Sequence, residues 1–269
     1  MRTRLGLATG LLLLLGLWVA CETVPITGRS QLILLSEAQE VRMGLQAYRQ
    51  ILGKSKVSRD PELNAMVRRV GSRIASATGR TDYRWEFTVI EGDKRINAFA
   101  LPGGKVAVYT GMLRVTKDDA GLATVIGHEV AHAIARHGAE RVSQGLLVQV
   151  GLTAVQVGMA NRDPRTVRRV ATLLGAGASV GVILPFSRAQ ESEADRLGLI
   201  YMARAGYDPR AAISFWQRME AATRGRGRPP EFLSTHPSHG ARIRQIQRWI
   251  PEALRYYRAS SARGRAQWG

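Results

Sequence analysis

The sequence predicts an α+β fold that is predominantly α-helical. Most of the chain carries apolar residues at helical spacing, whereas the region from Trp85 to Thr110 alternates apolar with polar or smaller residues. Only 6% of the 269 residues are aromatic while 45% are hydrophobic, which suits a mostly helical globular protein. A chain of this length can form one good core with at most a small additional lobe. We therefore expect one main domain over residues 36–257.

The first 20 residues have the layout of a secretory signal. Arg2 and Arg4 precede an apolar run over residues 11–17 that is too short to indicate a membrane span. Ala20, a small residue suited to the position before a cleavage site, stands directly before Cys21. The protein is therefore expected to leave the cytoplasm.

Cys21 is the single cysteine, so an internal disulfide is excluded. A cysteine directly after the predicted cleavage site is typical of a bacterial lipoprotein, so we expect Cys21 to be lipidated and residues 21–35 to form a tether. Glu22 stands where an aspartate would signal inner-membrane retention in some bacteria, which favours the outer membrane. The alternative is an uncleaved anchor or an ordinary signal peptide with an incidental cysteine.

The formal net charge of +18 could indicate a nucleic acid or an anionic membrane surface as partner. Only five of the 39 basic residues are lysines, and the arginines are scattered along the chain. The sequence contains no recognisable nucleic-acid-binding motif. We therefore expect no nucleic-acid partner and favour an acidic lipid or envelope surface.

Helical periodicity marks several segments outside the region that carries chemistry. Residues 37–53 and 61–78 each follow a residue suited to the N-cap and read as scaffold helices. Residues 146–159 and 167–184 are apolar but interrupted by glycine and glutamine. We expect these two to be buried or membrane-resting helices rather than a transmembrane hairpin.

A small sheet is expected between residues 85 and 110. Pro102 follows one of its strands, and proline favours an edge position because it cannot donate to the ladder. An edge strand can pair with an extended peptide, whereas a simple hairpin would have no such role. The candidate substrate-binding residues are therefore Asn97, Ala98, Phe99, Ala100 and Leu101.

The segment 124–136 reads as an apolar helix that carries His128, Glu129 and His132. Residues four apart share a helix face, so both imidazoles can bind one zinc ion while Glu129 reaches a water on the metal as general base. Helical histidines often have no metal, but burying these three side chains without partners would cost several kcal/mol. His137 lies off the metal-facing stripe and is predicted to be a surface residue.

The second half of the site lies in residues 187–195. On a helix Glu191 and Asp195 share a face, so one can bind the metal while the other orients a metal-bound imidazole. Glu193 points elsewhere. Two histidines, one carboxylate and an open position are typical of a catalytic zinc site with one ion per chain.

With both halves in view, the chain resembles the HtpX and CAAX prenyl protease superfamily of zinc metalloendopeptidases, and most closely its periplasmic, BepA-like branch. The resemblance rests on four segments in the order of the family, residues 97–104, 128–132, 187–195 and 234–243. It implies a gluzincin-like fold with a small sheet beside the zinc helix. It also implies that Glu191 is the third ligand, with Glu193 as the competitor.

Two residues near the C-terminus complete the candidate site. The resemblance implies that His236 can sit over the metal and fill its open position; a transition-state hydrogen-bond donor or a loop histidine bonded to backbone are the alternatives. Arg242 is a candidate donor to the oxyanion or to a substrate carboxylate. A last helix is expected over residues 243–254 and a basic disordered tail over 258–269. We expect no C-terminal helical-repeat domain of the kind found in longer BepA-like proteins.

These features predict a zinc metalloendopeptidase of the bacterial cell envelope that hydrolyses misfolded or unassembled envelope proteins. Its partners would be unfolded envelope polypeptides and, through the N-terminal lipid or anchor, the membrane. The alternative is a lipid-anchored chaperone-like or binding factor for outer-membrane protein assembly, with a zinc site kept mostly silent by His236.

Overall fold

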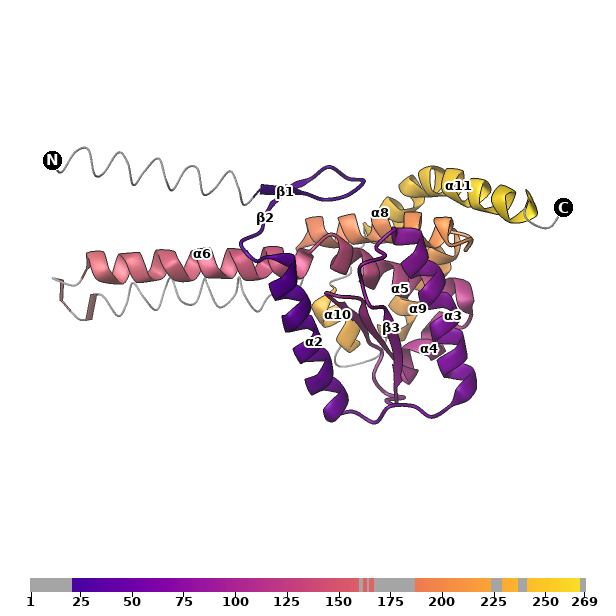
Figure 1. Ribbon diagram of the computed structural model, residues 1–269, viewed down its shortest axis with the longest axis horizontal. Helices are drawn as coiled ribbons and strands as arrows, with labels where there is room; N and C mark the ends of the chain where they lie inside the picture. Colours follow the sequence, from indigo (N-terminus) through magenta and orange to yellow (C-terminus); the bar gives the residue numbers. More distant parts are fainter. Residues whose placement is uncertain are drawn as a thin grey trace. The chain divides into compact units, whose positions relative to one another are not determined.

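The computed structural model describes residues 21–159, 162–163, 165–166, 187–223, 229–236 and 241–266 (Figure 1). The fold is α+β and predominantly helical, as predicted. The chain divides into two compact units, where the sequence suggested one main domain. The first unit combines Met1–Glu37 with Gly138–Leu184, and the second combines Ala38–His137 with Pro185–Gly269. The predicted signal over residues 1–20 and the predicted helix over 167–184 lie outside the described residues.

The first unit contains a hairpin and a long helix. β1 (Cys21–Thr23) pairs antiparallel with β2 (Ser30–Leu32), so the segment expected as a tether is partly folded. Most of α6 (His137–Gly158) belongs to this unit, and the helix begins nine residues before the predicted start at 146. Arg29 binds Glu140 of α6 at 2.7 Å, and the amide of Leu34 donates to Ser143 Oγ at 2.8 Å. These contacts attach the hairpin segment to the helix.

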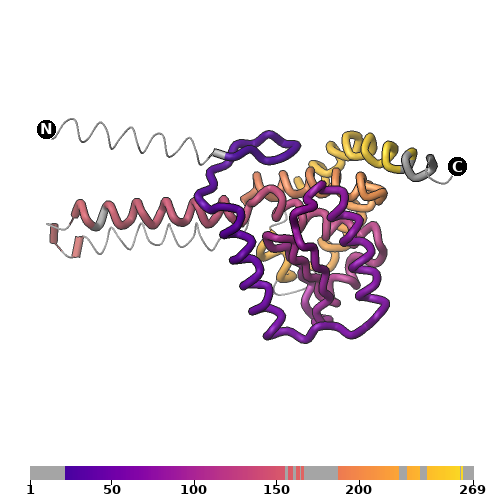
Figure 2. The backbone as a smooth tube through the Cα atoms, viewed as in Figure 1, coloured from indigo at the N-terminus to yellow at the C-terminus, as the bar shows by residue number. Residues whose placement is uncertain are grey.

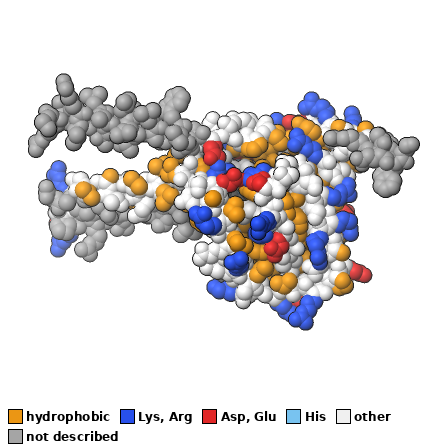
Figure 3. All heavy atoms as spheres, viewed as in Figure 1, with side chains coloured by type: hydrophobic (Ala, Val, Ile, Leu, Met, Phe, Trp, Pro, Cys, Tyr) orange, Lys and Arg blue, Asp and Glu red, His pale blue; other side chains and the backbone are white. Residues whose placement is uncertain are grey.

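Hydrophobic side chains gather along α6 (Figure 3). No charged residue occurs between Arg141 and Arg162, a stretch that covers most of the helix. The first unit also carries most of the exposed large hydrophobic side chains among the described residues: Ile26, Leu34, Val142, Leu146, Leu147, Val148, Val150 and Val157. Within the described part of the chain, no helix has both the length and the apolarity that crossing a membrane requires.

In the second unit, α2 (Glu37–Gly53) and α3 (Pro61–Thr78) have the predicted bounds. Asp60 caps α3 by accepting hydrogen bonds from the amides of Glu62 and Leu63, and proline at the first helical position needs no such bond. Gly79 ends the helix in the left-handed conformation that glycine adopts without strain.

The sheet of the second unit has three strands, β3 (Glu86–Ile90), β4 (Ala98–Leu101) and β5 (Lys105–Tyr109). β5 lies in the middle, parallel to β3 and antiparallel to β4, with Val106 opposite both Phe87 and Ala100. β4 is therefore an edge strand, as predicted from Pro102. It packs beside α5, the helix that carries the zinc motif.

α5 (Asp119–Ile134) is the centre of the second unit, and every residue from Gly121 to Ile134 is buried. It packs against α8 (Arg188–Arg204), α9 (Ala211–Thr223) and α3, and α4 (Thr110–Thr116) leads into it from the sheet. Figure 2 traces the backbone of these helices. Two further helices, α10 (Glu231–Thr235) and α11 (Arg242–Ala266), follow in the chain.

The C-terminal segment differs from the prediction. α11 continues to Ala266, although residues 258–269 were expected to be a disordered tail. Ser260 donates a hydrogen bond to the carbonyl of Ala203 at 3.1 Å, which ties the extended helix to the end of α8. Residues 267–269 lie outside the described range.

Candidate metal centre and active site

Close packing of α5 on α8 brings the two halves of the motif together. A Cβ atom added at Gly127 would lie 3.0 Å from the carbonyl oxygen of Gly198, and one added at Gly198 would lie 2.9 Å from the backbone nitrogen of His128. Only glycine allows two helix backbones to approach this closely. The crossing therefore depends on glycine in both helices, and it places Glu191 opposite the histidines.

Local sequence fixes the start of α8 just before its functional residues. Ser187 accepts a hydrogen bond from the amide of Gln190, and the Gln190 side chain accepts one from the amide of Ser187. This capping box starts the helix so that Glu191 and Asp195 stand one turn apart on the face toward α5.

The side chains of His128, His132, Glu191 and His236 form one buried cluster, with their candidate ligand atoms all within 4.8 Å of one another. The Nε2 atoms of the two motif histidines are 3.2 Å apart. Oxygens of Glu191 lie 3.5 Å from Nε2 of His128 and 3.3 Å from Nε2 of His132. Nδ1 of His236 lies 3.3 Å from Nε2 of His128 and 2.9 Å from Oε1 of Glu191.

These separations fit a tetrahedral metal site. Ligands about 2.0–2.1 Å from zinc at tetrahedral angles lie about 3.3 Å from one another, which is close to the distances measured between the candidate ligand atoms. Oε2 of Glu191 is buried, with Nη1 of Arg242 at 3.1 Å and Nε2 of His128 at 3.5 Å, and neither contact has the geometry of a hydrogen bond. Three imidazoles and one carboxylate are also donors that zinc prefers. The donor set therefore fits a zinc ion.

The electrostatics of the cluster favour a positive charge at its centre. Burial would raise the pKa of Glu191, but hydrogen bonds with His128, His132 and His236 outweigh burial and hold this pKa far below its usual range. Burial lowers the pKa of His132 well below its ordinary value, which keeps this imidazole neutral. For His128 burial acts in the same direction, but Asp195 and Glu191 outweigh it and raise the pKa to about 9.

Glu129 lies beside the cluster and is suited to act as a base. It is only 3% exposed, and burial raises the pKa of its carboxyl group despite the nearby histidines. The backbone amide of Ala100 in β4 faces this carboxyl group and acts to lower its pKa. Its Oε1 lies 3.4 Å from Nε2 of His236 and makes no hydrogen bond with any described residue.

His236 is held in the cluster by the short helix α10. Its ring stacks on Phe232, one turn earlier, at 4.6 Å between centroids and 24° between planes. The amide of Phe232 donates to the carbonyl of Ile96, which ties α10 to the segment before β4. The sequence suggested that this histidine could fill the open corner of a metal site. In the structure its Nδ1 lies among the candidate ligand atoms of the cluster.

Asp195 contacts His128, and Arg242 binds Asp195. Oδ1 of Asp195 lies 2.9 Å from Nδ1 of His128, on the side of the ring away from the candidate ligand atoms. The guanidinium of Arg242 donates two hydrogen bonds of 2.8 Å to Asp195 and lies flat on Trp216, 3.5 Å from the ring centre. Its third nitrogen lies 3.1 Å from Glu191.

Arg242 thus has a carboxylate near each guanidinium nitrogen. The sequence suggested Arg242 as a donor to the oxyanion or to a substrate carboxylate, but a fully buried guanidinium bound in this way favours a positioning role. Trp216, which covers Arg242, carried no signal in the sequence beyond its apolar character.

The prediction that His137 is a surface residue is wrong. This side chain is fully buried, with Nδ1 at 2.9 Å from Nδ1 of His132 and Nε2 at 3.0 Å from Oε2 of Glu193. Glu193, the alternative third ligand, is absent from the ligand cluster and binds His137 instead. One signal could have flagged Glu193 as buried, since Leu197 and Ile200 follow it at helical spacing on the same face.

The candidate substrate-binding residues lie where an edge strand should present them. Phe99, Ala100 and Leu101 are half-buried, and Ala98 is buried. The carbonyl of Asn97 accepts a hydrogen bond from Tyr109, and its side chain accepts one from the amide of Ala98. The amide of Ala100 faces Glu129, so the edge strand passes directly beside the candidate base.

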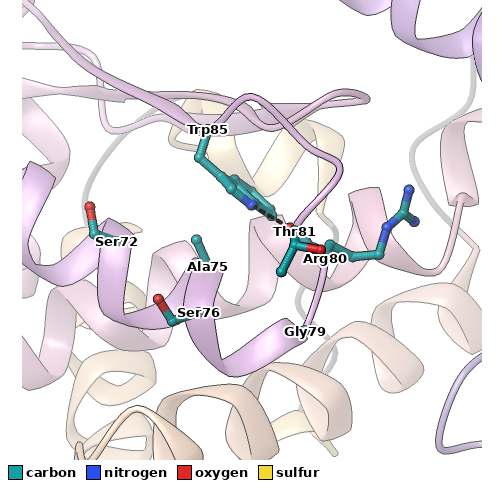
Figure 4. A pocket seen from close by; sticks show the side chains of 7 residues that line it. All are labelled: Ser72, Ala75, Ser76, Gly79, Arg80, Thr81 and Trp85. Carbon is teal, nitrogen blue, oxygen red and sulfur yellow. Dashed lines mark hydrogen bonds between the residues drawn. The ribbon is translucent and has the colours of Figure 1, made fainter.

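A separate pocket lies between the end of α3 and the segment before β3 (Figure 4). Its lining contains no carboxylate, histidine or cysteine, and the indole of Trp85 donates its hydrogen bond to the carbonyl of Arg80. The pocket therefore lacks the acid, base and ligand groups found at the histidine cluster. The lining residues are Ser72, Ala75, Ser76, Gly79, Arg80, Thr81 and Trp85.

Comparison with known proteins points to the same chemistry. Residues 61–250 match the family model described as Peptidase family M48. The chain is 39% identical over 237 residues to the mitochondrial metalloendopeptidase OMA1 of Schizosaccharomyces pombe, covering 86% of this chain and 67% of that protein. It is 33% identical over 263 residues to the human mitochondrial metalloendopeptidase OMA1, covering 93% and 50%.

The chain is also 33% identical over 229 residues to the beta-barrel assembly-enhancing protease of Escherichia coli, covering 83% of this chain and 46% of that protein. It thus spans about two thirds of the fission-yeast relative and about half of the other two. The resemblance to BepA-like metallopeptidases is confirmed, and the chain belongs to Peptidase family M48 and is a metallopeptidase.

Proposed function

We propose that this protein is a zinc-dependent endopeptidase of the bacterial cell envelope that hydrolyses misfolded or unassembled envelope proteins. The observation that carries the proposal is the buried cluster of His128, His132 and Glu191, whose donor atoms have tetrahedral spacing next to Glu129. The name of the Escherichia coli relative, a beta-barrel assembly-enhancing protease, supports envelope proteins as substrates.

In the proposed mechanism His128, His132 and Glu191 hold the metal. Zinc bound there would lower the pKa of a water molecule and polarise the peptide carbonyl. Glu129 accepts the proton of the attacking water and passes it to the leaving amine, a task that its raised pKa suits. Asp195 keeps His128 in the tautomer that offers Nε2 to the metal.

The edge strand β4 is proposed to align the substrate. A peptide that adds to the free edge of β4 would pass Glu129, because the amide of Ala100 lies next to its carboxylate. Backbone pairing makes few demands on side chains. This mode of binding therefore suits an enzyme that acts on unfolded polypeptides of varied sequence.

His236 is proposed to close the site. Its Nδ1 lies 3.3 Å from Nε2 of His128 and 2.9 Å from Oε1 of Glu191, which supports a position in competition with a substrate carbonyl or water. Replacing His236 by alanine should raise basal proteolysis by opening this corner. A His236→Ala enzyme that keeps its zinc but loses activity would instead identify the histidine as a transition-state donor.

We further propose that Cys21 is lipidated and that the protein faces the periplasm on the outer membrane. The apolar surface of α6 supports contact with a lipid surface in addition to the N-terminal anchor. Cys21→Ala should move the protein from the membrane fraction to the soluble fraction while leaving casein hydrolysis unchanged. Mass spectrometry of the intact N-terminus, before and after inhibition of lipoprotein processing, would identify the modification directly.

The decisive test of the enzymatic proposal is hydrolysis of unfolded casein, with and without a chelator, by the wild type and by Glu129→Gln. Loss of the general base should lower kcat by about 10²–10⁴-fold while zinc stays bound, because glutamine cannot accept the proton. Equal cleavage by the wild type and the variant would defeat the assignment of Glu129.

A second function is favoured by the position of His236 alone. If His236 never moves away from the metal site, the site would be catalytically inactive. The protein would then act as a lipid-anchored chaperone-like or binding factor for outer-membrane protein assembly. In that case the wild type and the Glu129→Gln variant would bind casein and suppress its aggregation equally well. Neither protein would cleave casein.

A further inference from the structure

The two motif histidines each have an inner and an outer ring nitrogen. The inner Nε2 atoms face each other and Glu191 in the ligand cluster. The outer Nδ1 of His128 lies 2.9 Å from the carboxylate of Asp195. The outer Nδ1 of His132 lies 2.9 Å from another imidazole, that of His137.

The contacts from His132 to His137 and from His137 to Glu193 fix one arrangement of protons if His132 is to bind a metal through Nε2. A neutral His132 that offers the lone pair of Nε2 must carry its proton on Nδ1. That N–H must donate to Nδ1 of His137, which therefore carries no proton. The proton of His137 then lies on Nε2, from which it donates to Glu193 at 3.0 Å. The three side chains form one chain of hydrogen bonds with every donor matched to an acceptor.

The backbone between α5 and α6 is shaped to aim His137 inward. A continued helix would carry position 137 away from the face of His132, because residues five apart do not share a face. Arg136 instead adopts a left-handed conformation with φ of 55°, and α6 starts directly after it. The guanidinium of Arg136 binds the buried carboxylate of Glu40, with Nε 2.9 Å from Oε1, and this pair holds the turn.

We propose that His137 and Glu193 are positioning residues of the metal centre, which fix the tautomer and orientation of His132 and so strengthen metal binding. The inference rests on the proposed zinc site. The hydrogen bond to the Glu193 carboxylate polarises His137, which makes Nδ1 of His137 a better acceptor and Nε2 of His132 a better ligand. Asp195 supports His128 directly, whereas Glu193 supports His132 through the imidazole of His137.

The proposal is tested by the affinity of the full chain for zinc, measured by competition with a chromogenic chelator. His137→Leu removes the acceptor while filling a similar volume, and it should weaken zinc binding by about 10–100-fold. His137→Asn returns a carbonyl oxygen close to the position of Nδ1, and its affinity should lie nearer to the wild type than to the leucine variant.

Glu140→Gln is the matched control. It neutralises a buried carboxylate that lies on α6, three residues after His137, and that binds Arg29. Zinc affinity of this variant should stay within about threefold of the wild type, since outer-shell effects act through hydrogen bonds to ligands. A loss as large as that of His137→Leu would mean that any change in α6 disturbs the centre, and would overturn the proposal.

A second measurement detects the hydrogen bond between His132 and His137 directly. Imidazole-selective ¹H–¹⁵N NMR of the zinc-loaded protein should show His132 protonated on Nδ1, with a proton resonance shifted downfield by the bond to His137. The resonance should move upfield in His137→Leu while the rest of the spectrum remains that of a folded protein.

The outcomes separate the two proposals. A wild type that binds zinc, together with an unchanged affinity and an unchanged Nδ1–H resonance in His137→Leu, would overturn the relay and leave the proposed function intact. An asparagine variant as weak as the leucine variant would also overturn it. A folded wild type that binds no zinc would overturn both proposals.

Discussion

The two histidines of the proposed metal centre are supported in different ways. His128 is held by a carboxylate, Asp195, which is itself bound twice by the buried Arg242. His132 is held by an imidazole, His137, which is bound by Glu193. The first support contains a buried ion pair with an arginine, and the second contains a hydrogen-bonded histidine between His132 and the carboxylate. The ion pair should therefore dominate folding stability, while both supports are proposed to act on the metal.

Asp195→Ala should cause the largest loss of folding stability. It leaves the guanidinium of Arg242 buried without its main partner, which costs about 3–5 kcal/mol of folding free energy. Chemical denaturation in the presence of a chelator measures this cost without any contribution from bound metal. Asp208→Asn is the control, because it removes a carboxylate–arginine pair at the surface, where Arg210 is largely exposed, and should cost less than about 1 kcal/mol. Similar losses in the two variants would contradict the role given to the buried pair.

Gly198→Ala should lower folding stability by forcing α5 and α8 apart. The added methyl group would lie 2.9–3.1 Å from backbone atoms of Gly127 and His128, so the helices must separate, at a cost of about 1–3 kcal/mol. Gly151→Ala in α6 is the matched control, since nothing lies within 4 Å of its Cβ position. That variant should gain about 0.5–1 kcal/mol from helix propensity. Thermal denaturation would refute the packing argument if both variants changed stability with the same sign.

His137→Leu should cost less stability than Asp195→Ala. Its loss leaves the buried N–H of His132 without an acceptor, a penalty of about 1–3 kcal/mol, but strands no fully buried arginine. The same denaturation series with chelator provides the comparison. A cost equal to or above that of Asp195→Ala would show that the two supports do not differ as described.

Glu252→Gln should cause the smallest loss of folding stability. Arg196 binds Glu252 as Arg242 binds Asp195, but at a partly exposed site between α8 and α11, so the pair contributes about 0.2–1 kcal/mol. The bond to Arg196 lowers the pKa of Glu252. The stabilisation is therefore complete above the ordinary glutamate pKa of about 4.3 and is lost as the pH falls through the lower folded-state pKa. The free energies of unfolding of the wild type and the variant should differ at pH 7 and converge in acid. A difference in unfolding free energy that grows as the pH falls would contradict this pH dependence.

The half of the site that sequence spacing could predict lies on regular helices. His128 with His132, and Glu191 with Asp195, are pairs four apart, so an unbroken helix fixes which face they share. The caps at Asp60 and Gly79 bounded α3 for the same reason, because the chemistry of a helix end is local.

The features that the sequence did not reveal depend on breaks and tertiary contacts. Arg136 is not a residue type that predicts a left-handed turn, so nothing in the spacing showed His137 turning back to His132. The support of Ser260 by Ala203 is likewise a contact between distant segments, and without it the basic end of α11 reads as disordered. The position of His236 follows from Phe232, whose packing no periodicity describes.

Metal content of the purified chain tests the central claim most directly. Elemental analysis of folded wild type, prepared without chelator, should find close to one zinc per chain, and the same content in Glu129→Gln. Glu191→Ala, which removes the only carboxylate ligand proposed, should lose most of it. A folded wild type without any transition metal, or a Glu191→Ala variant that retains the full complement, would contradict the account.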